Sequence, residues 1–200
     1  MLPSDFIIVA IVLRLAGGAK YLLSTLRGKA QPNIVSWSLW SLTALIAFAS
    51  QISSKGVGAE ALVTLAIGIG PLAVVVVGLV KGAHRLSVLT RLDVLCLVLA
   101  LVGVILWIKT SDLLLALLMS IVADIISSIP TVAKSYRAPK SESASAYSLT
   151  IVSMVVTLLT LQQWGVMNWA FPLYILAINL TFVMLILLPK QLRYRLQRAF

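Results

Sequence analysis

Long runs of apolar residues, separated by short clusters of charged residues, glycine and serine, follow one another along the whole chain. The runs are close to the length of about 20 residues that a helix needs to cross the hydrocarbon core of a bilayer. A helix also satisfies its own backbone hydrogen bonds there, where no water is present. The pattern predicts an all-α integral membrane protein with seven transmembrane helices, over residues 6–26, 34–52, 59–80, 93–108, 113–133, 147–164 and 169–188.

The composition supports this interpretation. Of the 200 residues, 60% are hydrophobic and 11% are charged, whereas soluble domains have about 45–50% apolar and about 25% charged residues. A chain of this length could not hide so many apolar residues in one aqueous core. The first apolar run lacks the preceding basic residues of a signal peptide, so we expect it to remain as a helix.

The basic residues predict the orientation. With the chain crossing seven times, one face carries only Lys55 and Lys109, and the other face carries twelve basic residues: Arg27, Lys29, Lys81, Arg85, Arg91, Lys134, Arg137, Lys140, Lys190, Arg193, Arg195 and Arg198. The positive-inside rule then places the N-terminus outside and the C-terminus in the cytoplasm. The net charge of +10 therefore indicates contact with anionic lipid headgroups and not with nucleic acid. We expect a bacterial inner membrane.

The order of the predicted helices contains an internal repeat. A shift of 110 residues superimposes the first three spans on the last three and leaves the fourth without a counterpart. A three-helix unit ends on the side of the membrane opposite its start, so one extra crossing makes two such units parallel. The predicted domains are residues 1–81 (first repeat), 82–111 (linker with the inverting helix) and 112–200 (second repeat and basic tail).

The 3+1+3 arrangement resembles the PQ-loop superfamily, which includes the SWEET sugar transporters, cystinosin-like carriers and the KDEL receptor. Pro130 and Thr131 stand in the place of the Pro-Gln motif, followed by basic residues and a serine-rich start to the next helix. Lys20 and Tyr21 occupy that place in the first repeat. The resemblance implies two parallel three-helix repeats that transport a solute. It also implies a solute-binding role for Asn179, at mid-height of the third helix of its repeat.

Two charged residues lie within predicted spans and are separated by the repeat offset: Arg14 in the first span and Asp124 in the fifth. A charge at the bilayer centre costs about 2.5–3.5 kcal/mol on insertion scales, and it usually faces the interior of a helix bundle. We expect an ion pair that lines a central route. A buried structural brace or a snorkelling side chain is the alternative.

Small polar residues extend this predicted lining. Asp124, Ser127, Ser128 and Thr131 share one face of a helix, and the other candidates for the substrate pathway are Thr43, Ser153 and Thr157. Serine and threonine in membrane helices also bond to their own backbone or to a neighbouring helix. The prolines Pro71 and Pro130 are expected either to act as hinges or only to shape packing.

The sequence lacks the residues that several classes of enzyme need for catalysis. The single histidine, His84, cannot form a metal cluster, and no HExxH or GxSxG motif is present. We therefore expect no enzyme and no cofactor. The function predicted is a carrier that moves a small polar solute by alternating access, and the alternative is a non-transporting membrane receptor or assembly factor. Gly78 and Gly82 have the GxxxG spacing of helix dimers, so self-association remains open.

Overall fold

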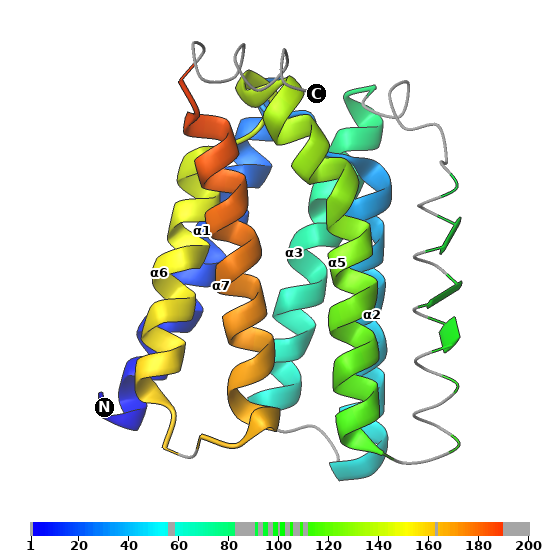
Figure 1. Ribbon diagram of the computed structural model, residues 1–200, viewed down its shortest axis with the longest axis vertical. Helices are drawn as coiled ribbons and strands as arrows, with labels where there is room; N and C mark the ends of the chain where they lie inside the picture. Colours follow the sequence, from blue (N-terminus) through cyan, green and yellow to red (C-terminus); the bar gives the residue numbers. More distant parts are fainter. Residues whose placement is uncertain are drawn as a thin grey trace.

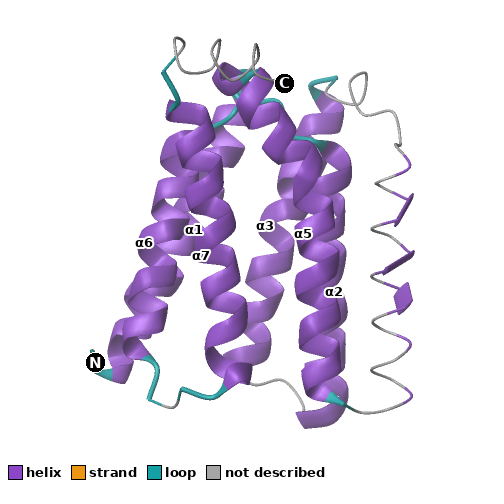
Figure 2. Ribbon diagram, viewed as in Figure 1, coloured by secondary structure: helices purple, strands orange, loops and turns teal. Residues whose placement is uncertain are grey.

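The computed structural model describes residues 2–55, 59–82, 112–162 and 164–189, and isolated positions between 91 and 109. These residues form helices and the loops between them (Figures 1 and 2). The elements are η1 (Ser4–Phe6), α1 (Ile7–Leu26), α2 (Ile34–Lys55), α3 (Ala59–Val80), α5 (Leu113–Arg137), η3 (Pro139–Ser141), α6 (Ala144–Thr160) and α7 (Val166–Leu187).

Three of the described helical segments are long and apolar enough to cross a membrane: Ile7–Leu26, Leu117–Arg137 and Asn168–Leu187. Three shorter apolar segments accompany them: Ile34–Leu45, Ile67–Val80 and Ala144–Thr160. The predicted span 93–108 lies outside the described residues, apart from isolated helical positions. The all-helical fold is therefore compatible with a membrane protein, and the number of seven spans stays a prediction.

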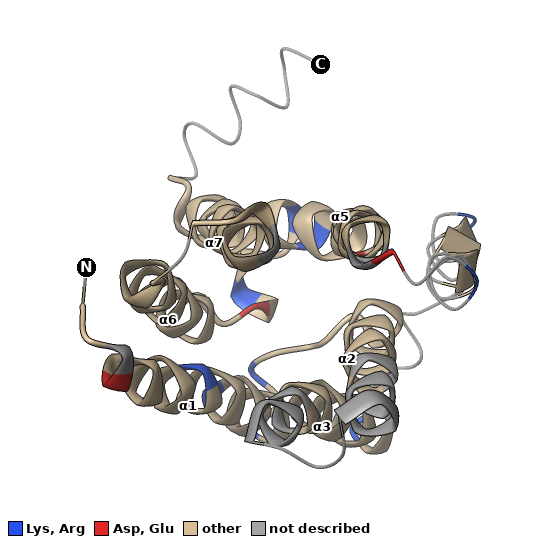
Figure 3. Ribbon diagram, turned by 90° about the horizontal axis from the view of Figure 1, so that it is seen from below, with Lys and Arg blue, Asp and Glu red and all other residues tan. Residues whose placement is uncertain are grey.

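The six described helices form a closed ring when the bundle is viewed along its length (Figure 3). The neighbouring pairs are α1 and α3, α3 and α2, α2 and α5, α5 and α7, α7 and α6, and α6 and α1. Helices α1, α3, α5 and α7 run in one direction, and α2 and α6 run in the other (Figure 1). The end of α3 and the start of α5 lie at opposite ends of the bundle.

The side chains are distributed inside out relative to a soluble domain. Large apolar residues cover the outer faces of the helices, for example Ile8 (63% exposed) on α1 and Met184 (63% exposed) on α7. The buried residues include many small polar ones: Ser36, Ser41, Ser127, Ser128, Thr131, Ser135, Thr150, Ser153, Thr160 and Asn179. An apolar exterior around a polar interior is the distribution expected when lipid is the solvent.

The loops between α1 and α2 and between α5 and α6 meet at one end of the bundle, which we name the loop end. Gly28 ends α1 with a φ of 68°, a left-handed conformation that glycine adopts without a steric penalty. The chain then turns so that the backbone N–H of Gln31 donates to the carbonyl of Ser141 at 2.9 Å. This bond ties the two loops together across the ring.

Helices α1 and α6 approach closely at Gly17. A Cβ added to Gly17 would lie 3.0 Å from the carbonyl oxygen of Ala146, whereas a Cβ added to Gly18 would meet nothing within 4 Å. Gly17→Ala should therefore lower the free energy of unfolding by about 1–3 kcal/mol through overpacking. Gly18→Ala should leave it unchanged or raise it by about 0.5–1 kcal/mol, because glycine is a poor helix former. Unfolding in detergent measures both, and equal effects would contradict the close approach.

Candidate functional site

The two charged residues singled out in the sequence are held by separate hydroxyl groups. The Arg14 guanidinium on α1 donates to Thr150 Oγ1 on α6 at 3.3 Å. The Asp124 carboxylate on α5 accepts a hydrogen bond from the Tyr174 hydroxyl on α7. Both charged side chains have intermediate exposure. They come from opposite sides of the ring, because α1 and α5 are not neighbours in it.

The direct ion pair expected from the sequence is not formed. Neither Arg14 nor Asp124 forms a salt bridge with the other, whereas Lys134 and Glu142 do form one, at 2.8 Å. The arrangement therefore presents a guanidinium and a carboxylate, each held by a separate hydroxyl, with no direct bond between them.

The polar face of α5 divides between two neighbours. Ser128 is fully buried and lies 3.5 Å from the Tyr174 hydroxyl, which extends the Asp124 cluster along the helix. Ser127 bonds back to the carbonyl of Asp124 at 2.9 Å, and its own carbonyl accepts the Ser36 hydroxyl of α2 at 2.6 Å. Thr131, one turn further, is fully buried and has no hydrogen-bond partner for its hydroxyl. The face is thus buried as predicted, but only Asp124 and Ser128 share Tyr174.

The remaining predicted pathway residues use their polar groups on backbone carbonyls. Asn179 is 6% exposed and donates to Ile175 at 2.8 Å on its own helix. The hydroxyls of Thr43 and Thr157 also bond within their helices. Ser153 instead joins α6 to α1, donating to the carbonyl of Ala10 at 2.7 Å. Their contact with a solute stays a prediction.

The predicted hinge prolines lie within helices, Pro71 in α3 and Pro130 in α5, and α7 contains a third, Pro172. Proline cannot donate the usual backbone bond of a helix, and nearby hydroxyls often bond to the freed carbonyls. Serines of α2 bond to the carbonyl three residues before each predicted hinge, next to the carbonyl that the proline frees: Ser41 to Gly68 at 2.9 Å and Ser36 to Ser127 at 2.6 Å. Helix α2 thus ties together the proline regions of α3 and α5.

A second polar cluster, at the loop end, was missed in the sequence. The side chain of Glu142 is completely buried and accepts three hydrogen bonds. Its partners are the Tyr21 hydroxyl at 2.8 Å, the Tyr147 hydroxyl at 2.7 Å and Lys134 Nζ at 2.8 Å. We name these four residues the Glu142 cluster. A buried carboxylate is stable only when it is paired and hydrogen-bonded, and this cluster meets both conditions.

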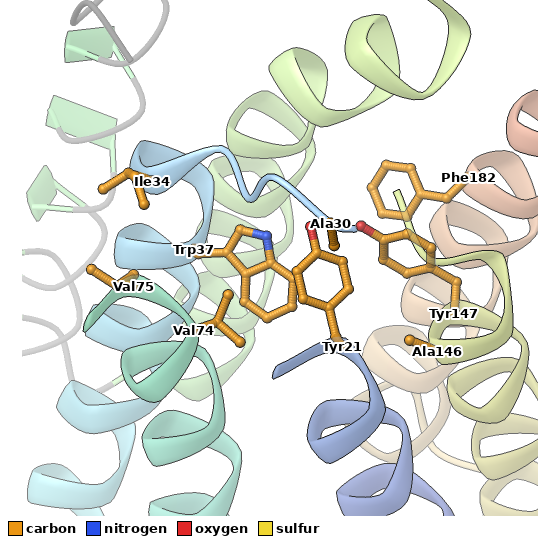
Figure 4. Packing of buried hydrophobic residues seen from close by; sticks show 9 residues of the cluster. All are labelled: Tyr21, Ala30, Ile34, Trp37, Val74, Val75, Ala146, Tyr147 and Phe182. Carbon is orange, nitrogen blue, oxygen red and sulfur yellow. The ribbon is translucent and has the colours of Figure 1, made fainter. Parts of the chain in front are cut away.

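Five aromatic side chains close a circuit of contacts beside the Glu142 cluster, and we name them the aromatic plug: Tyr21, Trp37, Trp40, Phe182 and Tyr147 (Figure 4 shows all but Trp40). Successive ring centroids are 4.3 to 6.5 Å apart, within or slightly below the range of about 4.5–7 Å that is usual for aromatic pairs. The plug draws residues from α1, α2, α6 and α7.

The aromatic plug contains two tryptophans near the start of α2. Tryptophans at such positions often lie at the membrane interface, but Trp37 is 7% exposed and Trp40 packs against Phe182. Both indole N–H groups are buried without an acceptor. Trp164, at 57% exposure, remains consistent with an interfacial position. Trp107 lies outside the described residues.

Together the fold and the site define an all-helical chain that is compatible with an integral membrane protein and has charged groups inside its helix ring. Among the described residues, no group of His, Cys, Asp and Glu could hold a metal ion. The chain matches no protein-family model, and comparisons with curated proteins and with solved structures find no match.

Proposed function

We propose that the protein is a PQ-loop-like, SWEET-like membrane carrier that moves a small polar solute by alternating access. Its fold would be seven helices in a 3+1+3 arrangement, with the N-terminus outside and the C-terminus in the cytoplasm. The ring supports this arrangement, because the neighbour order α1, α3, α2 is repeated by α5, α7, α6. The opposite positions of the end of α3 and the start of α5 require a connection along the length of the bundle.

Contacts between equivalent residues also support two parallel repeats at the 110-residue offset. Gln31 bonds to Ser141. The 110-residue offset makes these two residues equivalent to each other, as expected of a contact beside a two-fold axis. The contact of Ser36 with Ser127 joins α2 to α5. Its equivalent is the close approach of Ala146 to Gly17, which joins α6 to α1. Two unrelated three-helix halves would have no reason to meet at matching positions.

The proposal is supported most by the placement of Arg14 and Asp124 inside the ring without a direct bond between them. Each charge is tethered by one hydroxyl, Thr150 or Tyr174, and keeps partial exposure. Charges in a membrane protein that do not form a brace are expected to serve a solute or an ion. A zwitterion would place its acidic group on Arg14 and its basic group on Asp124, and an anion would bind Arg14 alone.

The orientation proposed from the positive-inside rule puts the loop end in the cytoplasm, next to the anionic headgroups that its lysine and arginine residues would contact. A bacterial inner membrane is the proposed location. Rocking of the two repeats against each other would expose the Arg14 and Asp124 groups to one side at a time.

Thermal unfolding of the purified protein tests for a solute. A panel of sugars, amino acids, organic anions and nucleosides is added in detergent at two pH values. A ligand at about 100 times its dissociation constant stabilises the folded state by about 2.7 kcal/mol. We expect one class to raise the unfolding temperature, and the effect to be lost in Arg14→Ala and in Asn179→Ala.

Lys20→Ala provides the matched control, because Lys20 is an exposed cation on the same helix as Arg14. It should retain the full response to the ligand. A panel without any response from folded protein would instead favour a receptor or assembly factor on the same fold.

A further inference from the structure

The Glu142 cluster joins the two halves of the ring through a single side chain. Lys134 and Tyr147 come from α5 and α6, which flank Glu142 in sequence, whereas Tyr21 comes from α1. Tyr21 is 1% exposed and reaches Glu142 across 121 residues of sequence. Its hydroxyl is therefore the group that ties the first half to the buried carboxylate.

Tyr21 also belongs to the aromatic plug, where its ring lies between Trp37 and Tyr147, with centroids 4.3 and 5.8 Å away. Figure 4 shows the Tyr21 and Tyr147 hydroxyls pointing to the same side. Beyond them, the two loops are joined by the bond from Gln31 to Ser141. Contacts between the halves at the loop end thus come together around Tyr21.

The same end contains buried polar atoms without partners. The hydroxyls of Thr131 and Ser135 are fully buried and unbonded, and so is the indole N–H of Trp37. Such groups lose their hydrogen bonds to water without compensation, which disfavours the closed arrangement. The three unpaired groups therefore make the packed loop end less stable than it would be with all its polar groups bonded.

We infer that the hydrogen bond between Tyr21 and Glu142 is a latch that keeps the loop end closed, and that its release opens the interior of the ring to the solution at that end. This inference rests on the proposed carrier function only in one respect: the carrier function gives the reason why the loop end would open. The latch itself is a property of the two halves, and it can be measured without any solute.

Accessibility of a reporter cysteine tests the latch. Cys96→Ala removes the single native cysteine, and Thr131→Cys places a thiol in the buried interior at a position whose hydroxyl has no hydrogen-bond partner. In oriented vesicles, a membrane-impermeant methanethiosulfonate is applied from the loop end. Tyr21→Phe should raise the labelling rate by about tenfold, since it removes a hydrogen bond to a charged group.

Tyr147→Phe is the matched control, because it removes the same hydroxyl from the same carboxylate but within one half. It should change the labelling rate by less than about twofold. Ile129→Cys, on the exposed face of α5, is a second reporter that neither tyrosine variant should affect. Glu142→Asp keeps the charge but withdraws the carboxylate from Tyr21, and it should raise the labelling rate as Tyr21→Phe does. It serves as the second variant if Tyr21→Phe folds poorly.

Equal labelling of the Tyr21→Phe and Tyr147→Phe proteins would overturn the latch, whether or not a solute is ever transported. Faster labelling in Tyr21→Phe and Glu142→Asp alone would establish it, even for a protein that responds to no solute in the ligand panel. The two outcomes therefore separate failure of the latch from failure of the proposed carrier function.

Discussion

Asp124→Asn and Arg14→Gln should each lower the rate of solute uptake into proteoliposomes by about 30-fold or more. In the bound complex each residue would pair with the opposite charge of the solute. Removing one partner of such a hydrogen-bonded charge pair costs about 2–5 kcal/mol, and about 1.4 kcal/mol corresponds to a factor of ten. Both replacements keep a polar amide. Asparagine has the size of aspartate and can still accept from the Tyr174 hydroxyl, whereas glutamine is shorter than arginine and gives up the single bond to Thr150. The fold should therefore survive while the charge needed by the solute is lost.

A double-mutant cycle on unfolding separates this role from a structural brace. Because no direct bond joins Arg14 to Asp124, the coupling free energy between Arg14→Ala and Asp124→Ala should be small, below about 0.5 kcal/mol. Lys20→Ala should retain full uptake. Coupling of several kcal/mol with unchanged uptake would make the two residues a brace and remove them from the pathway.

Glu142→Ala should lower the free energy of unfolding by about 3–5 kcal/mol. The variant leaves Lys134, with a side chain only 20% exposed, without its counter-charge, and it leaves two buried tyrosine hydroxyls without an acceptor. Breaking a buried ion pair by removing one partner is strongly destabilising for this reason.

Lys140→Ala is the control for Glu142→Ala. Lys140 is an exposed charge in η3, two residues from Glu142, and its loss should change stability by less than about 0.5 kcal/mol. Denaturant or thermal unfolding in detergent measures both variants. A loss below about 1 kcal/mol in Glu142→Ala would mean that water replaces the carboxylate, and the loop end would then be open to solvent.

The helices could be predicted from the sequence because each is a run of apolar residues bounded by polar ones. Helix α3 covers the predicted residues 59–80, and α1 differs from its predicted span by one residue. Helix α5 continues to Arg137, beyond the predicted 133, because Lys134 lies in its last turn and bonds to Glu142. Hydropathy does not include such a bond, so it ended the span too early.

The partners of the charged residues could not be predicted in the same way. Tyr174 lies in an apolar helix, where an aromatic residue is expected to face lipid. Only the packing of α7 against α5 brings it to Asp124. Glu142 follows Lys140 and Ser141 in what reads as a solvated loop. Its burial depends on Tyr21, which lies 121 residues away in sequence. Separations of this size leave no periodic signal in a single sequence.

The position of the loop contact has a consequence for how such a molecule could arise from two halves. Gln31 and Ser141 are equivalent in the proposed repeat and bond to each other, so the next residues, Pro32 and Glu142, would also lie beside its two-fold axis. Two identical subunits would have placed two buried carboxylates there, and like charges at short distance disfavour each other's ionisation. Joining the halves in one chain lets one carry Glu142 and the other a neutral proline. A fused protein can thus hold its two halves together with one buried carboxylate, whereas a homodimer of identical halves could not.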